Sequence, residues 1–338
     1  MKKILCYLVF LLCIISFISE AAGKKEKFKP DGKELFIINE YAPVTRIQVH
    51  TVPEIGTSKF LPIEKYKGMV GYVDKVIETK YDSYKKIVLK NGDVFYLIKT
   101  SYSSSNPKYE SEEYLISMEE YEKVKNNVEE TKKIKLNNIS DISIQVATAG
   151  KYGIYDVTLS NGLNLRWNDF KILQNFIKNI TDETDAKLLI NTLNEGGIYL
   201  YYDEIDNIYQ IYMGGDSTFE MFLKIFDAKK IMPVAKVTYS DSNWVFANSF
   251  VVFQNGKKLS RDNVQFKRDS KSVVVEWYNL VCSKEDLDSI RLLDENEEAT
   301  VRFYGSNHNK DKQISTESIK KVKKIIVLYD MLTKYYTI

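Results

Sequence analysis

The sequence predicts an α+β fold, built mainly of antiparallel β-hairpins and small sheets with capped helices packed on one face. Three observations predict it. Asn-Gly dipeptides interrupt alternating apolar runs, serine-led capping boxes precede helical patterns, and strand runs follow one another through turns without regular strand–helix–strand alternation. We therefore expect two or three small domains.

The first segment, residues 1–21, has the three-part pattern of a secretory signal peptide. Two lysines follow the initiator, residues 4–18 form an apolar run, and small residues stand at the positions that signal peptidase reads. The run is shorter than the ~20 apolar residues that a membrane-spanning helix needs. We expect cleavage near Ala21-Ala22 and export to the periplasm or the cell exterior; an uncleaved N-terminal anchor is the alternative.

Composition and charge exclude several classes of protein. The 338 residues are 44% hydrophobic and 28% charged, which is too apolar for a disordered chain. The formal net charge is +2 and falls to +1 when residues 1–21, with two lysines and one glutamate, are removed. Near-neutral charge argues against a dedicated nucleic-acid binder. Cleavage leaves Cys282 as the single cysteine, and no other apolar run approaches membrane length, so neither an internal disulfide nor a membrane span is expected afterwards.

Hairpins are the clearest local prediction. Asn-Gly tolerates the two positive φ angles of a type I′ turn, and it occurs between apolar runs at Asn91-Gly92, Asn161-Gly162 and Asn255-Gly256. A further hairpin is expected over residues 198–213, around an acidic tip. Other strands are expected at 234–239, 246–253, 264–267, 273–278 and 299–304.

Helix starts are indicated by capping residues. We expect helices to begin at Ser117, Asn168, Thr181 or Asp182, Ser217, Ser283 and Ser315. Three of these serines are followed three residues later by an acidic residue, the pattern of a capping box. The box at Ser217 predicts a helix over residues 219–226. The helix after Ser315 carries apolar residues at helical spacing, so one of its faces should pack on a core.

Domain boundaries are expected in the polar stretch 125–133 and near Pro233. The predicted division is a signal peptide at 1–21, a β-rich domain ending in a short helix at 22–130, an α+β domain at 131–232, and an α+β domain ending in an amphipathic helix at 233–338. Residues 80–92 and 151–162 share Lys-Tyr-x-x-Tyr, an apolar pair ending in Leu, and Asn-Gly. Either the middle domain is a diverged duplicate of the first, or half-buried hairpins in a chain of this composition simply look alike.

No catalytic residue is predicted. His50 alternates with apolar neighbours and is expected to be exposed on a strand, whereas His308 lies in a polar stretch expected to form a turn. Cys282 precedes a helix at a position suited to apolar packing. Residues 214–217 indicate a turn and an N-cap, because the rest of a phosphate-loop motif is missing. No cofactor is implied.

Tyrosines in the 198–213 hairpin are the candidate binding residues. Alternation places Tyr199 and Tyr201 on one face of the first strand and puts Tyr209 and Tyr212 on opposite faces of the second. A strand so apolar on both faces is either buried on both sides or presents aromatic rings to a ligand. Aromatic faces bind sugar rings and peptide chains by stacking and apolar contact.

The acidic tip of this hairpin is the candidate metal site. Asp203, Glu204 and Asp206 lie close together in the sequence, and Asn207 adds an amide oxygen. Hard oxygen ligands suit Ca²⁺, although the spacing is not that of an EF-hand. A solvated turn is the alternative.

The function that these observations favour is a non-enzymatic exported protein that binds a component of the cell envelope or a partner protein; nothing indicates its oligomeric state. One alternative is a secreted hydrolase, acting for example on glycans, which would need a cleft with two carboxylates and a raised pKa. A second is a folding or inhibitory accessory factor, which an exposed apolar patch would favour.

Overall fold

The computed structural model describes residues 25–43, 46–54, 57–80, 83–98, 115–137, 139–214, 218–227, 229–270, 272–306 and 308–338. This part of the chain holds 5 α-helices and 20 strands in antiparallel sheets, which is the α+β fold that the sequence predicts. It divides into two compact units: one contains described residues up to 134 together with 144–157, and the other contains 135–143 and 158–338. The predicted signal peptide lies outside the described residues. Within them, no helix is long and apolar enough to cross a membrane.

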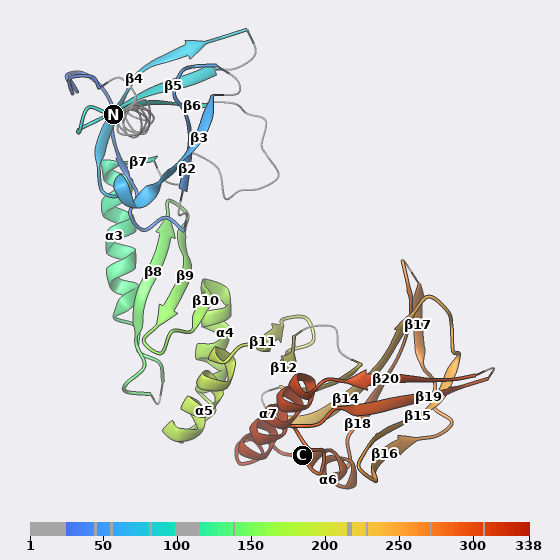
Figure 1. Ribbon diagram of the computed structural model, residues 1–338. Helices are drawn as coiled ribbons and strands as arrows, with labels where there is room; N and C mark the ends of the chain where they lie inside the picture. The colour runs from blue at the N-terminus through green and yellow to red at the C-terminus, as the bar shows by residue number, and fades with distance from the viewer. Residues whose placement is uncertain are drawn as a thin grey trace, which may run out of the picture. The chain divides into compact units, whose positions relative to one another are not determined.

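The first unit is built on a seven-stranded sheet with the strand order β3-β2-β6-β5-β4-β1-β7. Its elements are β1 (Leu35–Ile38), β2 (Arg46–His50), β3 (Ser58–Pro62), the short 3-10 helix η1 (Ile63–Lys65), β4 (Val70–Glu78), β5 (Ser83–Leu89), β6 (Val94–Ile98), β7 (Leu115–Ser117), α3 (Met118–Lys132) and β8 (Ile144–Gly150). Strands β4, β5 and β6 lie side by side (Figure 1). The next strand, β9 (Gly153–Leu159), forms a three-stranded sheet with β8 and with β10 (Asn164–Arg166).

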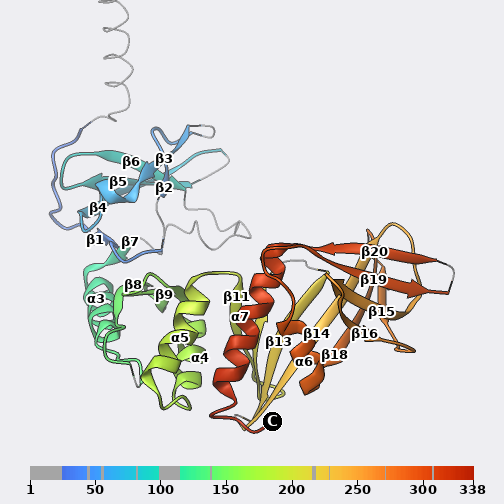
Figure 2. The same ribbon diagram turned by 60° about the horizontal axis from the view of Figure 1, so that its bottom comes forward.

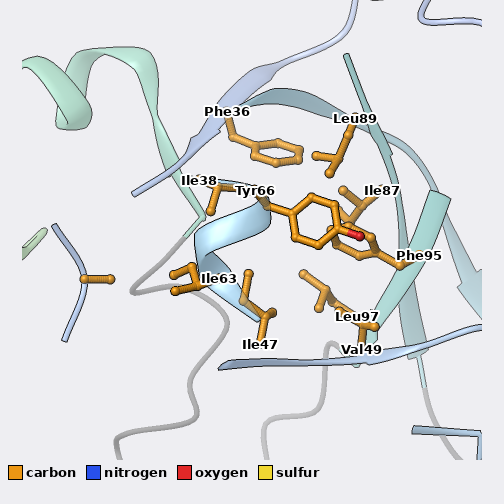
Figure 3. Close-up of a cluster of buried hydrophobic side chains, with 11 residues drawn as sticks. Phe36, Ile38, Ile47, Val49, Ile63, Tyr66, Ile87, Leu89, Phe95 and Leu97 are labelled. Carbon is orange, nitrogen blue, oxygen red and sulfur yellow. The ribbon is translucent and has the colours of Figure 1, made fainter. Parts of the chain in front are cut away.

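The core of the first unit gathers side chains from the sheet and from the turn after η1. Figure 3 shows Tyr66 reaching in from that turn toward Phe95 and Leu89. The ring centroids of Tyr66 and Phe95 are 6.2 Å apart, edge to face. The turn at Asn91-Gly92 joins β5 to β6 as predicted, but it is not the type I′ turn, because Gly92 has a positive φ of 85° and Asn91 does not have a positive φ. Alternate residues of these strands therefore point inward and bury the sheet's apolar face.

The second unit contains a six-stranded sheet, β11-β12-β13-β14-β18-β17, and a four-stranded sheet, β16-β15-β19-β20. Its elements after β10 are α4 (Trp167–Ile177), α5 (Glu183–Asn194), β11 (Ile198–Asp203), β12 (Ile208–Met213), β13 (Phe219–Phe226), β14 (Lys230–Asp241), β15 (Ala247–Gln254), β16 (Lys257–Arg261), β17 (Lys267–Ser270), β18 (Val274–Val281), α6 (Lys284–Arg291), β19 (Ala299–Gly305), β20 (Asn309–Ile314) and α7 (Thr316–Leu332). The hairpins predicted at 198–213 and at Asn255-Gly256 are both formed.

One face of the six-stranded sheet is covered. Helix α7 packs across β12, β13 and β14, and α4 and α5 pack on β11 (Figure 2). The four-stranded sheet covers the same face further along, where Tyr239 meets Phe303 and Tyr278 meets Phe250. The covered face of β13 is accordingly buried at each alternate residue. Helices on one face of a sheet are the arrangement that the sequence predicts.

Local capping signals locate most helices. Ser117 and Ser283 form capping boxes at the starts of α3 and α6, and the side chains of Asp182 and Ser315 cap α5 and α7. The predicted cap at Asn168 is wrong: the N-cap of α4 is Arg166, two residues earlier, and it makes no side-chain cap hydrogen bond. The expected boundary stretch 125–133 lies mostly within α3, and Pro233 lies within β14. The three-domain division stays a prediction.

The predicted helix over residues 219–226 is wrong, because this segment is strand β13. Its apolar residues alternate, and Phe219, Met221, Leu223 and Ile225 are all buried while the residues between them are only partly so. The capping pattern is a local signal, whereas pairing with β12 and β14 satisfies the backbone along both edges of the segment. Pairing with two neighbouring strands therefore decides the conformation, and the segment forms a strand. Ser217 itself lies outside the described residues.

The expectation for His50 is also wrong. His50 is buried, not exposed: its Nδ1 lies 3.2 Å from the carbonyl oxygen of Glu54 and 3.3 Å from Oγ1 of Thr57, and its ring meets Tyr84 edge-on. Glu54 and Thr57, which follow β2, contact the ring, and strand alternation does not reveal such contacts. His308 lies in the turn after β19, as expected, where the backbone N–H of Gly305 donates to the carbonyl oxygen of His308 at 3.2 Å. The residues that follow form strand β20, which the sequence does not predict and which pairs with β19. The strand expected at 264–267 begins only at residue 267.

Candidate functional site

Aromatic side chains gather on the second face of the six-stranded sheet. Residues directly opposite one another in an antiparallel ladder share a face. Tyr199 of β11 is opposite Tyr212 of β12, which is opposite Phe222 of β13. This row continues through β14 to Val281 of β18. Side chains alternate along each strand, so residues two and four positions from the row also belong to this face.

We call this surface the aromatic face and define it by Tyr199, Tyr201, Tyr212, Phe222 and Trp277. It is the face opposite the one that the helices and the four-stranded sheet cover. Tyr199 is 50% exposed, Tyr201 48% and Tyr212 38%. Aromatic side chains in a core are fully buried, whereas these three rings are exposed. They are therefore able to contact solvent or a ligand.

A hollow of about 370 Å³ lies in the middle of the aromatic face. Its aromatic wall is made by Tyr212, Phe222 and Trp277. The polar side chains that line it are Gln210, Glu220, Lys224, Lys236 and Asn279. The two amides each donate and accept hydrogen bonds, the lysines donate and the carboxylate accepts, so the hollow offers both kinds of group.

The charges in this hollow nearly balance. Lys236 Nζ donates to Oε2 of Glu220 at 3.3 Å across β13 and β14. Lys224 Nζ lies 5.9 Å from the centroid of the Phe222 ring, a cation–π contact. Two lysines against one glutamate leave a small positive excess, so the site does not demand a strongly charged ligand.

Tyr199 is positioned by its neighbours. Its ring centroid is 5.6 Å from that of Tyr212, and the ring lies against the backbone at Gly214. A Cβ at residue 214 would come within 2.3 Å of the Tyr199 ring. Glycine is thus required here for the ring to rest on the strand end, which holds it in line with the aromatic face.

The four predicted tyrosines fall on two different faces. Tyr199, Tyr201 and Tyr212 lie on the aromatic face, because the register of the hairpin places Tyr199 opposite Tyr212. Tyr209 lies on the covered face, 4.5 Å from Tyr202 and 5.1 Å from Phe176 of α4 between ring centroids, and burial raises its pKa. The structure therefore gives Tyr209 a packing environment and leaves the other three accessible.

Sequence reasoning missed Phe222 and Trp277. The capping pattern at Ser217 places Phe222 in a helix, although the period-two alternation of residues 219–226 marks it as a strand residue. Trp277 joins the site only through the pairing of β14 with β18, where it is opposite Thr238. That pairing joins residues far apart in sequence, and no local pattern indicates it.

The acidic tip of the β11–β12 hairpin is organised as a turn. Asp203 Oδ1 accepts hydrogen bonds from the backbone N–H groups of Ile205, at 3.0 Å, and Asp206, at 3.3 Å. Asn207 has a φ of 52° and its Nδ2 donates to Asp227 Oδ1 at 2.9 Å. Across the described residues, no group of three or more His, Cys, Asp or Glu side chains is arranged to hold a metal ion. Calcium binding by Asp203, Glu204 and Asp206 stays a prediction.

The candidate catalytic residues lie in different environments. His50 is buried in the first unit and His308 is exposed in the second. Cys282 is buried as expected, and burial raises the pKa of its thiol to about 12, so the reactive thiolate is scarce at neutral pH. Of the described carboxyl groups, those with a shifted pKa are all shifted downward, for example Glu183 to about 2 by hydrogen bonds from Ser140 and Lys187. A carboxylic acid catalyst would need the opposite shift.

Comparison of the chain with protein-family profiles, with curated proteins and with solved structures finds no match. The aromatic face and its hollow are therefore the features that indicate a function.

Proposed function

We propose that this chain is a non-enzymatic exported protein that binds a glycan of the cell envelope on its aromatic face. The observation that carries the proposal is a group of exposed and half-buried rings on one face of the sheet, beside a hollow that also offers amide, lysine and carboxylate groups. Binding sites of small ligands combine apolar walls with a few polar groups that fix orientation, which is the composition of this hollow.

A glycan suits these groups better than a purely apolar or strongly charged ligand. Sugar rings present C–H faces that pack on aromatic rings, and their hydroxyls both donate and accept hydrogen bonds. Gln210 and Asn279 also do both, while Lys236 and Glu220 partly neutralise each other. The nearly balanced charge of the hollow favours a neutral polar partner.

The extent of the aromatic face favours a chain of sugars. Its rings run from β11 to β18, which are the first and fifth strands in the order of the sheet. With strands about 4.8 Å apart, this distance is about 19 Å, longer than one sugar ring. Tyr199 and Tyr201 at the edge strand would bind one part of the chain and Trp277 another.

Export and the lack of enzymatic activity are inferred from features outside the aromatic face. The signal-peptide pattern of residues 1–21 favours a protein that works outside the cytoplasm. The downward pKa shifts of the carboxyl groups give no support to the alternative of a carboxylate-dependent hydrolase.

The proposal is tested by sedimenting the exported chain with insoluble envelope polysaccharide and measuring the bound fraction. We expect saturable binding, weakened about tenfold by Tyr212→Ala and by Trp277→Ala, since each removes one aromatic contact. The matched control is Tyr152→Ala, because Tyr152 is 73% exposed but belongs to the first unit. Circular dichroism would establish that the three variants are folded.

Two results would contradict the proposal. If no polysaccharide binds, or if Tyr152→Ala weakens binding as much as Trp277→Ala, the aromatic face is not a glycan site. If envelope peptides instead displace the polysaccharide and lose affinity in the same two variants, the face binds protein and the glycan assignment is wrong.

A further inference from the structure

Three polar residues that line the hollow of the aromatic face form a row across it. Glu220 of β13 is opposite Lys236 of β14, which is opposite Asn279 of β18. The three strands lie side by side (Figure 2). Because neighbouring strands are about 4.8 Å apart, the row spans about 10 Å, and its members share one face of the sheet. We call these three residues the polar row.

The polar row lies between two aromatic residues. Phe222 is two residues after Glu220 on β13, and Trp277 is two residues before Asn279 on β18, so the two rings are on opposite sides of the row. Side chains two residues apart on a strand share a face and are about 7 Å apart along it. A sugar ring that packs on either aromatic ring therefore has substituents within reach of the polar row.

Two members of the polar row form an ion pair. Lys236 Nζ donates to Oε2 of Glu220 at 3.3 Å, and the two side chains are half-buried or less exposed. The pair is neutral as a whole. Its charged groups nevertheless bind further partners, because an ammonium group has three N–H donors and a carboxylate has about four acceptor sites. A strong donor and a strong acceptor are thus held side by side in the hollow.

An amide group is the complement of this ion pair. Its N–H donates to a carboxylate while its C=O accepts from an ammonium group, so two charge-assisted hydrogen bonds form without any net charge on the ligand. The donor and the acceptor of an amide are different atoms, as they are in the ion pair. A hydroxyl has both functions on one oxygen and therefore matches Glu220 and Lys236 less well.

Charged substituents on a sugar do not suit the polar row. A carboxylate would lie beside Glu220 and an amino group, which is protonated at neutral pH, would lie beside Lys236, so like charges would repel in either case. A neutral substituent that both donates and accepts avoids this repulsion.

We propose that the polar row binds an acetamido group, so that the glycan on the aromatic face is built of 2-acetamido sugars. This inference rests on the proposed function, because it names the sugar of that same site. The acetamido N–H donates to the Glu220 carboxylate, the carbonyl oxygen accepts from the Lys236 ammonium group, and the methyl group packs on the ring of Phe222. Asn279 hydrogen-bonds a neighbouring hydroxyl of the sugar.

The assignment is tested by isothermal titration of the exported chain with three tetrasaccharides that share a β-1,4 backbone. They differ only in the group at C2 of each sugar: an acetamido group in chitotetraose, a hydroxyl in cellotetraose and an amino group in the chitosan tetramer. We expect chitotetraose to bind about tenfold more tightly than either of the others, because it alone satisfies both members of the ion pair.

Substitutions locate this preference in the chain. Glu220→Gln and Lys236→Met should each bring the affinities for chitotetraose and cellotetraose to within about twofold of one another, mainly by weakening chitotetraose. Lys230→Met is the matched control, because Lys230 is an exposed lysine on the same face of β14 that does not line the hollow. Trp277→Ala should weaken both tetrasaccharides and leave their ratio unchanged. Circular dichroism would establish that each variant is folded.

The outcomes separate this inference from the proposed function. Cellotetraose or the chitosan tetramer binding as tightly as chitotetraose would overturn the acetamido assignment and leave glycan binding intact. So would a preference for chitotetraose that persists in both Glu220→Gln and Lys236→Met. If no tetrasaccharide binds but envelope polysaccharide still sediments with the chain, the assignment alone is wrong. If neither binds, the assignment and the proposed function are both wrong.

Discussion

At the scale of single residues, the most constrained charge in the second unit is Glu276. Its carboxylate is fully buried, and its two oxygens accept hydrogen bonds of 2.8 Å from the backbone N–H groups of Val245, Phe246 and Ala247. Arg268 Nε adds a fourth donor at 3.1 Å. Charge-assisted bonds of this kind fix the backbone ahead of β15, where Phe246 adopts a positive φ of 55°. Glu276 thus serves the fold and lies on the covered face of the sheet.

Replacing Glu276 tests this role. We expect Glu276→Gln to lower the free energy of unfolding by about 3 kcal/mol, because the amide cannot accept all four bonds and leaves Arg268 without its charge partner. Urea denaturation followed by tryptophan fluorescence measures the change. Asp262→Asn, at an exposed position after β16, should leave stability within about 0.5 kcal/mol. Equal stability of the two variants would show that the buried carboxylate is dispensable.

At the scale of elements, strand β13 serves two surfaces at once. Its odd-numbered residues are buried beneath α7 and its even-numbered residues belong to the face that carries the hollow. Adjacent residues of this strand can therefore be altered with opposite consequences, which separates the stability of the sheet from its proposed binding.

Phe222 and Leu223 form the matched pair for this experiment. Leu223→Ala should cost about 2–5 kcal/mol of unfolding free energy, because Leu223 is fully buried and its truncation leaves a cavity. Phe222→Ala should cost about 1 kcal/mol or less but abolish most polysaccharide binding. Urea denaturation and sedimentation measure the two effects. Greater destabilisation by Phe222→Ala would mean that the aromatic face is covered in the folded protein.

The elements that the sequence predicts correctly are those with local causes. Caps at Ser117, Ser283 and Ser315 and the turn at Asn255-Gly256 each depend on a few neighbouring residues. The errors arise where a distant partner decides, as in β13, whose pairing outweighs a local capping pattern.

The residues of the candidate site also divide into those with a local sequence signal and those that depend on distant strand pairing. The many tyrosines between residues 198 and 213 indicate the edge of the aromatic face. Tyr199, Tyr201 and Tyr212 can therefore be named as candidate binding residues from the sequence. Trp277 and the polar lining of the hollow depend on the register of β14 with β18, which no local pattern encodes.

At the scale of the whole molecule, export is the premise on which the envelope function depends. We expect the mature chain to begin near Ala22, with one cysteine and a formal net charge of +1. Mass spectrometry of the chain recovered from the periplasm or the medium measures its N-terminal residue. Recovery of the chain from the membrane fraction with its first 21 residues intact would show an anchored protein instead.

The uncovered face of the six-stranded sheet also has an evolutionary consequence. Because its side chains alternate with those of the core, substitutions on it leave the packing beneath unchanged, and the backbone that presents them stays fixed. Ligand preference can then diverge among descendants of this chain while the scaffold is inherited intact. Related sequences should therefore vary most at the even-numbered positions of β13 and at the odd-numbered positions of β11, and least at the residues between them.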